Sequence, residues 1–325
     1  MKRVLHPREV MQQLAGGEPV SGEALAEHLG VTRAAVWKQI AALRELGLPV
    51  QARTKVGYCL PWPVQLLDAA QIRQESGPAG PPVHVHWELP STQDALAAMQ
   101  HEAPDLTVVL AEYQASGRGR RGHGWVSPPC LGIYLSCLKR FAGGPATLAG
   151  LSIAAGVAVA DALADTGAGE LQLKWPNDVL ADGAKLAGIL IEVQGEYDGP
   201  CIARVGVGVN VRLPPSLPGA LDQAVTDLAA RMPRALLARN ALAACLIRHL
   251  RAALLDFERE GLAPFLRAYA GRDMLAGRSL VLQGMPGLAR GTGRGVDARG
   301  ALLVEHEGGV TAIQSSHVSV RLAPG

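Results

Sequence analysis

Apolar residues recur at helical spacing in the first part of the chain. In the segment 33–46 they form one stripe that a helix would bury, which consists of Val36, Ile40, Leu43 and Leu46. The segment 21–30 has the same period, and Thr32 between the two can cap the second helix. Two short helices with a tight junction are typical of a helix-turn-helix, whose second helix lies in the major groove of DNA.

Residues outside this stripe are candidates for contacts with DNA. Extended runs at 48–52 and 58–61 follow the second helix, and the basic turn between them is typical of the wing of a winged helix. The candidates on the helix and the wing are Arg33, Ala34, Trp37, Lys38, Arg53 and Lys55. The alternative is a helical hairpin that packs on the rest of the protein or on a partner, because basic surface helices are common.

The pattern changes twice beyond the winged helix, which is expected at 1–62. Prolines and glycines flank a short amphipathic stretch at 63–82, which we interpret as a linker. From 83–270, strand-like runs alternate with alanine-rich helical runs, which predicts an α+β domain of catalytic size. The segment 271–325 has short alternating strands between glycines and no helical run, which predicts a small β-barrel. The chain is therefore expected to be multidomain.

Charge limits the classes of partner. The chain has 31 Lys and Arg against 29 Asp and Glu, a net charge of +2, which is too small for a protein that coats nucleic acid or an anionic membrane along its whole surface. Residues 1–62 hold eight basic side chains against five acidic ones, so the basic bias lies at the front of the chain. Binding to nucleic acid is therefore expected to be local to that segment.

Cysteine usage and hydropathy predict a cytoplasmic protein without a membrane segment. The five cysteines form no CxxC pair and are odd in number, so we expect reduced thiols in a cytosol. The N-terminus lacks the uninterrupted apolar run of a signal peptide. The longest uncharged run, 141–160, is broken early by Gly143, Gly144 and Pro145, so the remainder is too short to span a bilayer and is expected to be a buried helix.

The segment 111–125, AEYQASGRGRRGHGW, is the most informative for chemistry. Its glycines form the pattern GxGxxG after a predicted strand. A dinucleotide-binding turn also requires a helix directly after the glycines and an acidic residue about 20 positions later, and this sequence has neither. Arg118, Arg120 and Arg121 instead offer fork-shaped donors for a phosphate or a carboxylate. Trp125 can lie over a base, which favours a nucleotide phosphate. The alternative is an exposed basic loop for nucleic acid.

Two further segments present polar groups or space. Ser91, Thr92 and Gln93 come at a strand-to-helix junction, where they can bond a small polar ring or simply cap the helix. Gly206 and Gly208 share one face of a predicted strand, which leaves room for a ligand against the backbone or marks a bulge.

A third segment is the turn KWPND (174–178), followed by a hairpin and Lys185, whose ammonium can point inward or stay in solvent. No metal or nucleophile constellation competes with these segments. His84 and His86 lie two apart without an HExxH or a second cluster, and both GxSxG and GxxxxGK[ST] are absent.

Taken together and in this order, the segments resemble the bifunctional biotin protein ligase and biotin operon repressor family. The resemblance covers nearly the whole chain and is carried by VTRAAVWKQIAALRELG, EYQASGRGRRGHGW, KWPND, KLAGILIE, GVGVN and the GxxxxGALLVE of residues 295–305. It implies a catalytic domain similar to that of class II aminoacyl-tRNA synthetases and a C-terminal barrel of SH3-like fold. A winged helix in front marks the regulatory class of the family.

The resemblance also implies a two-step reaction. Biotin and ATP, with Mg²⁺, form biotinyl-5′-AMP, and the biotin then passes to a lysine of the biotin carboxyl carrier protein of acetyl-CoA carboxylase. The protein is further expected to repress biotin synthesis by binding operator DNA, as a homodimer when biotinyl-AMP is bound. The alternatives are a biotin-sensing regulator that has lost ligation and a lipoate-type ligase.

The resemblance implies the site residues position by position. The catalytic residues would be Lys185, Arg118 and Arg120. The biotin contacts would be Ser91, Thr92, Gln93, Gln114, Arg118, Gly119, Arg120, Lys185, Gly206 and Gly208. The ATP contacts would be Arg120, Arg121, Trp125, Lys174, Asn177 and Asp178. One position departs from the family pattern. The family has the sequence Ser-Thr-Asn where this chain has Ser91-Thr92-Gln93. Glutamine has one more methylene than asparagine, which would shift or remove the contact with the biotin ring.

Overall fold

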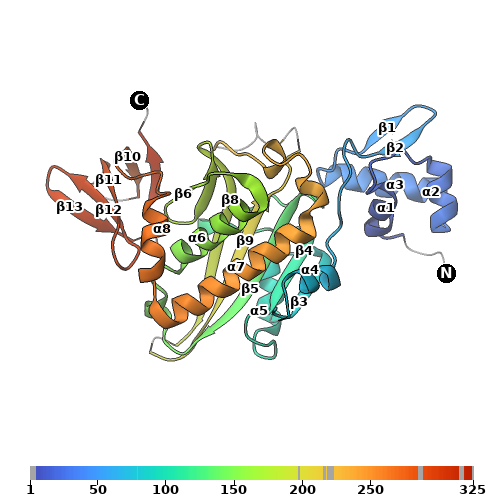
Figure 1. The fold of residues 1–325 in the computed structure, drawn as a ribbon. Coiled ribbons are helices and arrows are strands. Elements are labelled where there is room, and N and C mark those ends of the chain that lie inside the picture. The colour runs from blue at the N-terminus through green and yellow to red at the C-terminus, as the bar shows by residue number, and fades with distance from the viewer. Residues whose placement is uncertain are drawn as a thin grey trace.

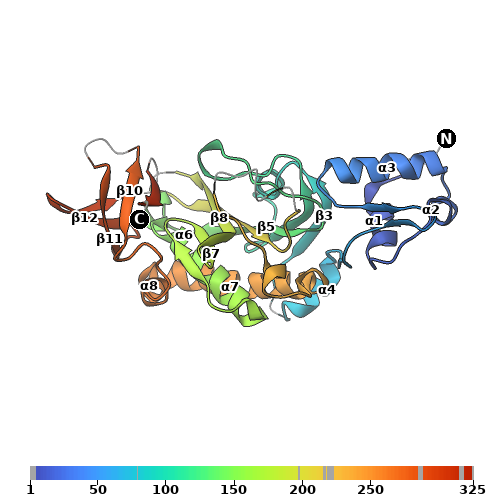
Figure 2. The same cartoon turned by 90° about the horizontal axis from the view of Figure 1, so that it is seen from above.

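The computed structural model describes residues 5–78, 80–196, 198–214, 217, 223–284, 288–314 and 318–323. Its elements form three parts in a row, with a helical unit at the N-terminal end, a large mixed sheet in the middle and a small sheet at the C-terminal end (Figure 1). The view from above has the same order (Figure 2).

The N-terminal part is a three-helix unit followed by a hairpin. Its elements are α1 (Pro7–Leu14), α2 (Gly22–Leu29), α3 (Arg33–Glu45), β1 (Gln51–Arg53) and β2 (Gly57–Cys59). The two predicted helices and the hairpin are confirmed, and the Thr32 hydroxyl caps α3 by accepting a 3.2 Å hydrogen bond from the Ala35 amide. Helix α1 has no counterpart in the predicted pattern, because its apolar residues cover only two turns.

The predicted stripe of α3 forms the core of this unit. Val36, Ile40 and Leu43 are fully buried, whereas Leu46 at the end of the helix is half-buried. The stripe faces α1, whose Met11 is also fully buried. Burial of one face leaves the opposite face of α3 in solvent, where the candidate DNA contacts lie.

The central part is built on a seven-stranded sheet. Its strands, in spatial order, are β3 (Val83–Leu89), β4 (Val108–Gln114), β5 (Gly132–Phe141), β9 (Cys201–Asn210), β8 (Ala184–Gly195), β7 (Asp178–Ala181) and β6 (Gln172–Lys174). Strands β3 and β4 are parallel, and every other neighbouring pair is antiparallel. The expected α+β character is confirmed.

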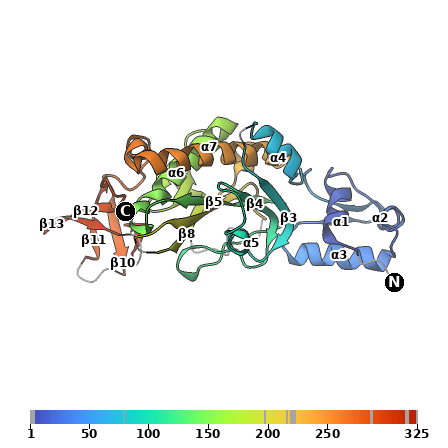
Figure 3. The same cartoon turned by 90° about the horizontal axis from the view of Figure 1, so that it is seen from below.

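Helices cover the two faces of this sheet unequally. Helices α6 (Leu151–Leu163) and α7 (Arg239–Glu260) lie together over one face, and α5 (Thr92–Met99) lies on the other (Figure 3). Short helical turns connect the elements at Arg120–Gly122, Pro145–Leu148, Ala164–Ala168, Leu228–Ala230, Ala235–Leu237 and Ala263–Phe265. On the second face, α5 packs against β4, β5 and β9.

Helix α6 is the apolar run that the sequence singled out. A 24-residue stretch, Pro145–Ala168, is apolar and long enough to cross a membrane by composition, but 67% of its apolar window is buried in the protein. It packs against α7 and strands of the sheet. The prediction of a buried helix is therefore confirmed.

The predicted linker 63–82 contains a helix, α4 (Ala69–Glu75), that packs on α7 and β3. Its Ile72 is fully buried. The chain before this helix is also held in place, because the buried guanidinium of Arg239 donates to the carbonyl of Gln65 at 2.8 Å. Contacts with the central part therefore position most of this segment.

The C-terminal part follows α8 (Leu266–Ala270) and is an antiparallel sheet. Its strands, in spatial order, are β13 (Gly309–Ile313), β12 (Leu302–His306), β11 (Arg290–Val296), β10 (Ser279–Gln283) and β14 (Ser319–Leu322). The predicted β-structure is confirmed, and no helix occurs in the residues of 271–325 that the structure covers. Closure into a barrel is not confirmed, because the two outer strands β13 and β14 have no ladder between them in this part of the structure.

Candidate active site

A cavity of about 490 Å³ lies on the face of the central sheet that α5 partly covers. It brings together every residue that the sequence proposed for biotin or for the nucleotide. These are Ser91, Thr92, Gln93, Gln114, Arg118, Gly119, Arg120, Arg121, Trp125, Lys174, Asn177, Asp178, Lys185, Gly206 and Gly208. They come from segments up to 117 residues apart, which only the folded sheet brings together.

One end of the cavity is a neutral hydrogen-bonding network at the start of α5. The Thr92 amide and hydroxyl both donate to Oε1 of Gln114, at 2.9 and 3.2 Å, and the Thr92 hydroxyl lies 2.7 Å from that of Ser136. The Gln114 amide group donates to Ser127 at 3.0 Å. Ser91 is the N-cap of α5, as the cap interpretation predicts. These bonds hold several donors and acceptors rigidly in one place.

The side chain of Gln93, in the first turn of α5, points toward the sheet. Its Nε2 donates to the carbonyls of Leu190 and Arg204 at 2.9 and 3.2 Å. Its Oε1 is buried and has no hydrogen-bond partner within the described part of the chain. A buried acceptor without a partner costs free energy unless a ligand or water satisfies it, so this oxygen is a site where a donor would be favourable.

The floor of the cavity is glycine. A Cβ atom on Gly206 would lie 2.7 Å from Nε2 of Gln93, and one on Gly208 would overlap the ring of Trp125. Gly188, which pairs with Gly208 across β8 and β9, is under the same ring, and a Cβ there would lie 2.9 Å from the indole carbon Cζ3. The Trp125 ring leaves no room for a Cβ atom at Gly188 or Gly208, and at Gly206 the Gln93 side chain would have to move. This supports the prediction of space. The regular β8–β9 and β5–β9 registers disfavour a bulge.

Sequence reasoning missed Gly188. The signal for it was present in KLAGILIE, where Gly188 follows Lys185 by three residues. A bulge in the β7–β8 pairing lies between them, and both residues line the cavity. Only the cross-strand register places it beside Gly208.

Basic side chains line the rest of the cavity, and two of them form ion pairs with carboxylates. Lys185 makes a 2.8 Å ion pair with Asp178 and lies 5.3 Å from the centre of the Trp125 ring. Arg118 bridges two carboxylates, Asp94 at 2.8 Å and Glu192 at 3.1 Å. The protein's own carboxylates therefore neutralise these two cations.

Two cations of the cavity are partly dehydrated. Burial lowers the pKa of Lys174, and the nearby charges of Lys185 and Arg321 lower it further, while Asp178 opposes them. Burial also lowers the pKa of Arg120, with a contribution from Arg121. Crowded, dehydrated cations bind an anion more favourably than separate solvated ones do, because the anion relieves their mutual repulsion.

The C-terminal sheet contributes to the cavity, which sequence reasoning missed. Val318, Ser319, Val320 and Arg321 line it, and the Arg121 guanidinium donates to the Val318 carbonyl. No local signal could have found this contact, because β14 lies almost 200 residues from the arginine loop. The sheet therefore closes one side of the cavity.

The candidate DNA contacts lie far from this cavity, on the N-terminal part. Arg33, Trp37, Arg53 and Lys55 line a second hollow between α3 and the wing. Ala34 and Lys38 are exposed on the same helix but do not line it. Trp37 is 62% exposed, which is unusual for a tryptophan and indicates a contact surface.

Two protein families match the parts of the chain that contain these residues. Residues 8–59 match the HTH domain family, and residues 88–210 match the biotin/lipoate A/B protein ligase family. The chain is 39% identical to the bifunctional ligase/repressor BirA of Escherichia coli over 99% of both chains. It is 30% identical to the protein of that name from Bacillus subtilis, over 94% of this chain and 95% of the relative.

The fold is similar to that of a biotin protein ligase from Aquifex aeolicus solved in complex with biotin and ATP. The TM-score is 0.63 and the identity 26%, over 74% of this chain and 99% of that one. Similarity to the two BirA proteins extends over the helix-turn-helix as well as the ligase region. The chain therefore belongs to the family of bifunctional biotin protein ligase/repressors.

Proposed function

We propose that this protein is a biotin protein ligase that also represses transcription of biotin synthesis by binding operator DNA. The observation that carries the ligase is the cavity itself, where a glycine floor joins a neutral hydrogen-bonding end to a cluster of Lys and Arg side chains. A polar ring with a carboxylate tail fits the first end and reaches the second. The identity to bifunctional ligase/repressors over nearly the whole chain supports the proposal.

In the proposed complex, the ureido ring of biotin lies at the neutral end. Ser91, Thr92 and Gln114 supply donors and acceptors there. The unpartnered Oε1 of Gln93 supports a role for this departure from the family pattern, since a ureido N–H is the kind of donor it needs. Gly206 and Gly208 let the ring system approach the strand backbone closely.

In the first step, a carboxylate oxygen of biotin attacks the α-phosphorus of ATP, and the bond from that phosphorus to pyrophosphate breaks. The two reactants are anions, so catalysis requires cations that cancel their repulsion and stabilise the charge that develops on the phosphorus. Lys185, Arg118 and Arg120 would take this role, which is supported by their place in the cavity lining together with Lys174 and Arg121. Trp125, Asn177 and Asp178 would contact the nucleotide.

In the second step, an uncharged lysine amine of the carrier protein attacks the acyl carbon of biotinyl-5′-AMP. An amide bond forms, AMP leaves with the electron pair of the broken acyl–oxygen bond, and the amine loses a proton. Lys185 would stabilise the departing phosphate oxygen. Because Lys185 and Arg118 are paired with carboxylates in the structure, substrate anions would replace Asp178, Asp94 and Glu192 as their partners.

The donors in the cavity are compatible with Mg²⁺ carried by ATP. Asp178 is the acidic residue among the described cavity-lining residues, and the Asn177 amide is next to it. Mg²⁺ in nucleotide sites is often held by one or two protein oxygens together with phosphates and water. The ion would neutralise phosphate charge, and Asp178 would have to release Lys185 to contact it.

The decisive experiment is the intact mass of a biotin carboxyl carrier domain after incubation with this protein, biotin and MgATP. We expect a gain of one biotinyl group, lost with Lys185→Ala and kept with Lys38→Ala, a matched change on the exposed face of α3. Absence of the gain with the wild-type protein, when biotin binding is still detectable, would favour a sensor without ligase activity. A gain with lipoate in place of biotin would favour a lipoate-type ligase.

A second function, DNA binding, is favoured by the exposed Trp37 and the basic residues around it. If Arg33, Lys38, Arg53 and Lys55 neutralise phosphates, the affinity for operator DNA falls steeply and linearly with salt on logarithmic scales. Removing one of these charges should reduce that slope by about 1. A salt-independent affinity would instead indicate a contact with protein.

The proposed repressor is a homodimer when biotinyl-AMP is bound. Sedimentation with and without the adenylate would test this. The central part is similar to class II aminoacyl-tRNA synthetases, and the C-terminal sheet is a barrel of SH3-like fold, supported by its order and by the bulge in the β11–β12 pairing. The protein acts in the cytoplasm, which its five free, buried cysteines support.

A further inference from the structure

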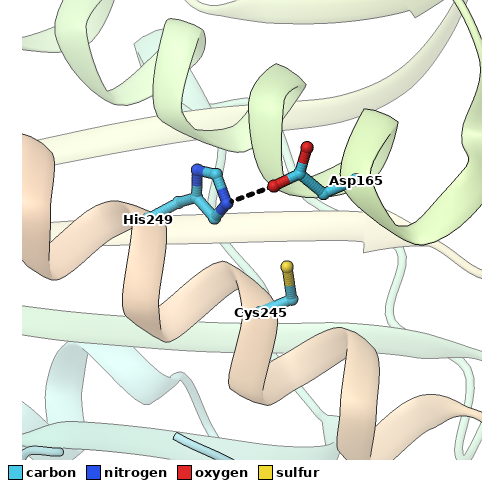
Figure 4. Close-up of side chains that lie close together, drawn as sticks. All are labelled: Asp165, Cys245 and His249. Atoms are coloured by element: carbon cyan, nitrogen blue, oxygen red, sulfur yellow. Dashed lines mark hydrogen bonds and ion pairs between the residues drawn. The ribbon is translucent and has the colours of Figure 1, made fainter.

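Three side chains with metal-binding atoms meet on the side of the sheet opposite to the cavity. Cys245 and His249 lie on successive turns of α7, and Asp165 lies in the turn that follows α6 (Figure 4). Within the described residues, this is the group of three or more Cys, His, Asp or Glu side chains that could hold one metal ion. The sequence does not reveal it, because Asp165 is 80 residues from Cys245.

The geometry of the cluster is close to that of a metal site. The Nε2 atom of His249 lies 2.9 Å from Oδ2 of Asp165, and the three potential ligand atoms all lie within 4.8 Å of one another. Ligands of a tetrahedral zinc ion are separated by roughly 3.3 to 3.6 Å, given metal–ligand bonds of about 2.0 to 2.3 Å. The spacing of residues four apart on a helix already aims Cys245 and His249 at the same point.

The backbone around the cluster is fixed, whereas one side of it is open to water. Helices α6 and α7 pack closely along their length, and Cys245 is 4% exposed. The Asp165 side chain is 65% exposed and that of His249 is 28% exposed. An ion can therefore enter from solvent, and a water molecule can serve as its fourth ligand, while the thiol side is shielded.

A metal ion would take the place of protons in this cluster. The Cys245 thiol donates a 3.5 Å hydrogen bond to the Ala162 carbonyl, so its proton must leave when a metal ion binds. The Arg248 guanidinium donates to the Glu75 carbonyl at 2.7 Å and also forms a hydrogen bond with the Cys245 side chain. A bound divalent ion would stabilise the thiolate and replace the proton in the bond between His249 and Asp165.

We propose that Asp165, Cys245 and His249 form a binding site for a borderline-soft divalent ion of the zinc class. A thiolate, an imidazole and a carboxylate are the ligands that Zn²⁺ and Co²⁺ take in proteins, whereas Mg²⁺ and Ca²⁺ require oxygen ligands. The site joins the turn after α6 to the middle of α7. Its effect is to stabilise the helical layer beneath the sheet, because an ion that binds the folded chain shifts folding by mass action.

The test uses full-length, tag-free protein that has been treated with a chelator and contains no nucleotide, since ATP binds divalent ions itself. Titration with Co²⁺ should produce a thiolate-to-cobalt absorption band in the near ultraviolet, which Zn²⁺ then displaces. The band should vanish in Cys245→Ser and persist in the matched control Cys137→Ser, which changes a buried thiol of β5 outside the cluster.

Two milder variants protect the test against misfolding. Asp165→Asn and His249→Ala change partly exposed side chains, and each should weaken Zn²⁺ binding by about tenfold or more in calorimetry. Zn²⁺ should raise the melting temperature of the wild-type protein but not of these variants. Ligation should be unchanged in all of them, since the cluster and the cavity lie on opposite faces of the sheet.

The proposal is overturned if the wild-type protein gives no cobalt–thiolate band, or if the band survives in Cys245→Ser. It is also overturned if Zn²⁺ stabilises the wild-type protein and the His249→Ala variant equally, in which case His249 and Asp165 form only a surface ion pair. Loss of ligation in the carrier-domain assay bears on the proposed function and leaves this result unaffected.

Discussion

At the scale of single residues, the cavity depends on the space above its glycines as much as on the polar groups that line it. Gly188, Gly206 and Gly208 have no positive φ that would favour glycine. Their importance is steric, because Gln93 and Trp125 occupy the space that a Cβ atom would need. The sequence predicted two of these glycines from their shared face. The third, and the identity of the side chains above them, depended on strand pairing.

The first prediction concerns Gly208. We expect Gly208→Ala to displace Trp125 and reduce biotin affinity by about tenfold or more, because its Cβ would overlap the indole ring. The control is Gly16→Ala, where a Cβ meets nothing within 4 Å. Isothermal titration with biotin measures both, and equal affinities of the two variants would contradict the steric role of Gly208.

The second prediction concerns Arg120. Removing its guanidinium in Arg120→Gly should release biotinyl-5′-AMP faster by about tenfold or more, because a charge-assisted bond to phosphate contributes about 1.5–3 kcal/mol. The escaped adenylate would label lysines indiscriminately. Mass spectrometry of a bystander protein detects this, with Arg299→Gly, an exposed arginine outside the cavity, as control. Undiminished retention and unchanged acceptor specificity would exclude the anchor role.

The third prediction concerns pH and Asp273. Burial raises the pKa of this carboxyl, and its Oδ2 is buried without a partner in the described structure. The folded chain therefore binds this proton more readily than the unfolded chain does, so the stability that protonation contributes is present at low pH and is lost as pH rises through the raised pKa. Asp273→Asn should then be the more stable protein at neutral pH, with a lead that shrinks as pH falls.

Urea unfolding of the wild-type protein and Asp273→Asn at neutral and mildly acidic pH checks this sign. The variant retains an oxygen for the Leu275 amide, which donates to Oδ1 of Asp273 at 2.9 Å. A difference between the two midpoints that stays constant with pH would mean that Asp273 is not the titrating group.

At the scale of elements, local pattern was sufficient where one face of an element is buried and the other is not. Helix α3 and the wing were predicted because a stripe, a cap and a basic turn agree. Helix α1 was missed because its Val10, Met11 and Leu14 form too short a pattern to separate from a loop. Helix α4 was read as part of a linker, since its docking depends on a surface that belongs to α7 and β3.

The fourth prediction concerns the way α4 and the preceding segment are held. Arg239 is fully buried, makes a 2.6 Å ion pair with Glu112 and donates to the carbonyls of Gln65 and Gly132. Arg239→Leu leaves Glu112 buried without its partner and should destabilise the central part by about 3–5 kcal/mol.

Urea unfolding followed by tryptophan fluorescence measures this loss. The control is Arg248→Leu, an exposed arginine of the same helix that donates to one carbonyl of α4, which should cost about 1 kcal/mol or less. If the two variants unfold at the same urea concentration, the buried pair does not hold the segment.

At the scale of the whole molecule, the DNA-binding unit is docked on the ligase rather than tethered loosely. Trp62 lies under the guanidinium of Arg212, 3.9 Å from ring centre to Cζ, and Val64 donates to the Ala15 carbonyl. Arg212 lies two residues after the end of β9, whose last residue, Asn210, lines the cavity. A contact between the two functions therefore begins two residues from the candidate active site.

The fifth prediction tests this connection. Arg212→Ala should leave ligation of the carrier domain intact but reduce, by several fold, the gain in operator affinity that biotinyl-5′-AMP produces, because the stacked pair joins the cavity strand to the winged helix. Binding titrations with and without the adenylate measure the gain, with Arg290→Ala on the C-terminal sheet as control. An undiminished gain would place the coupling elsewhere.

The sequence by itself determined the order of domains, the helix-turn-helix, the arginine loop and fifteen of the residues that line the cavity, because these depend on local spacing and on motifs. Tertiary structure alone decided which acids neutralise Lys185 and Arg118, which side chains cover the glycine floor, how β14 closes the cavity and how Asp165 meets Cys245 and His249. Each of these is a contact between residues far apart in the chain, whose geometry is set by strand register and helix packing rather than by any local pattern.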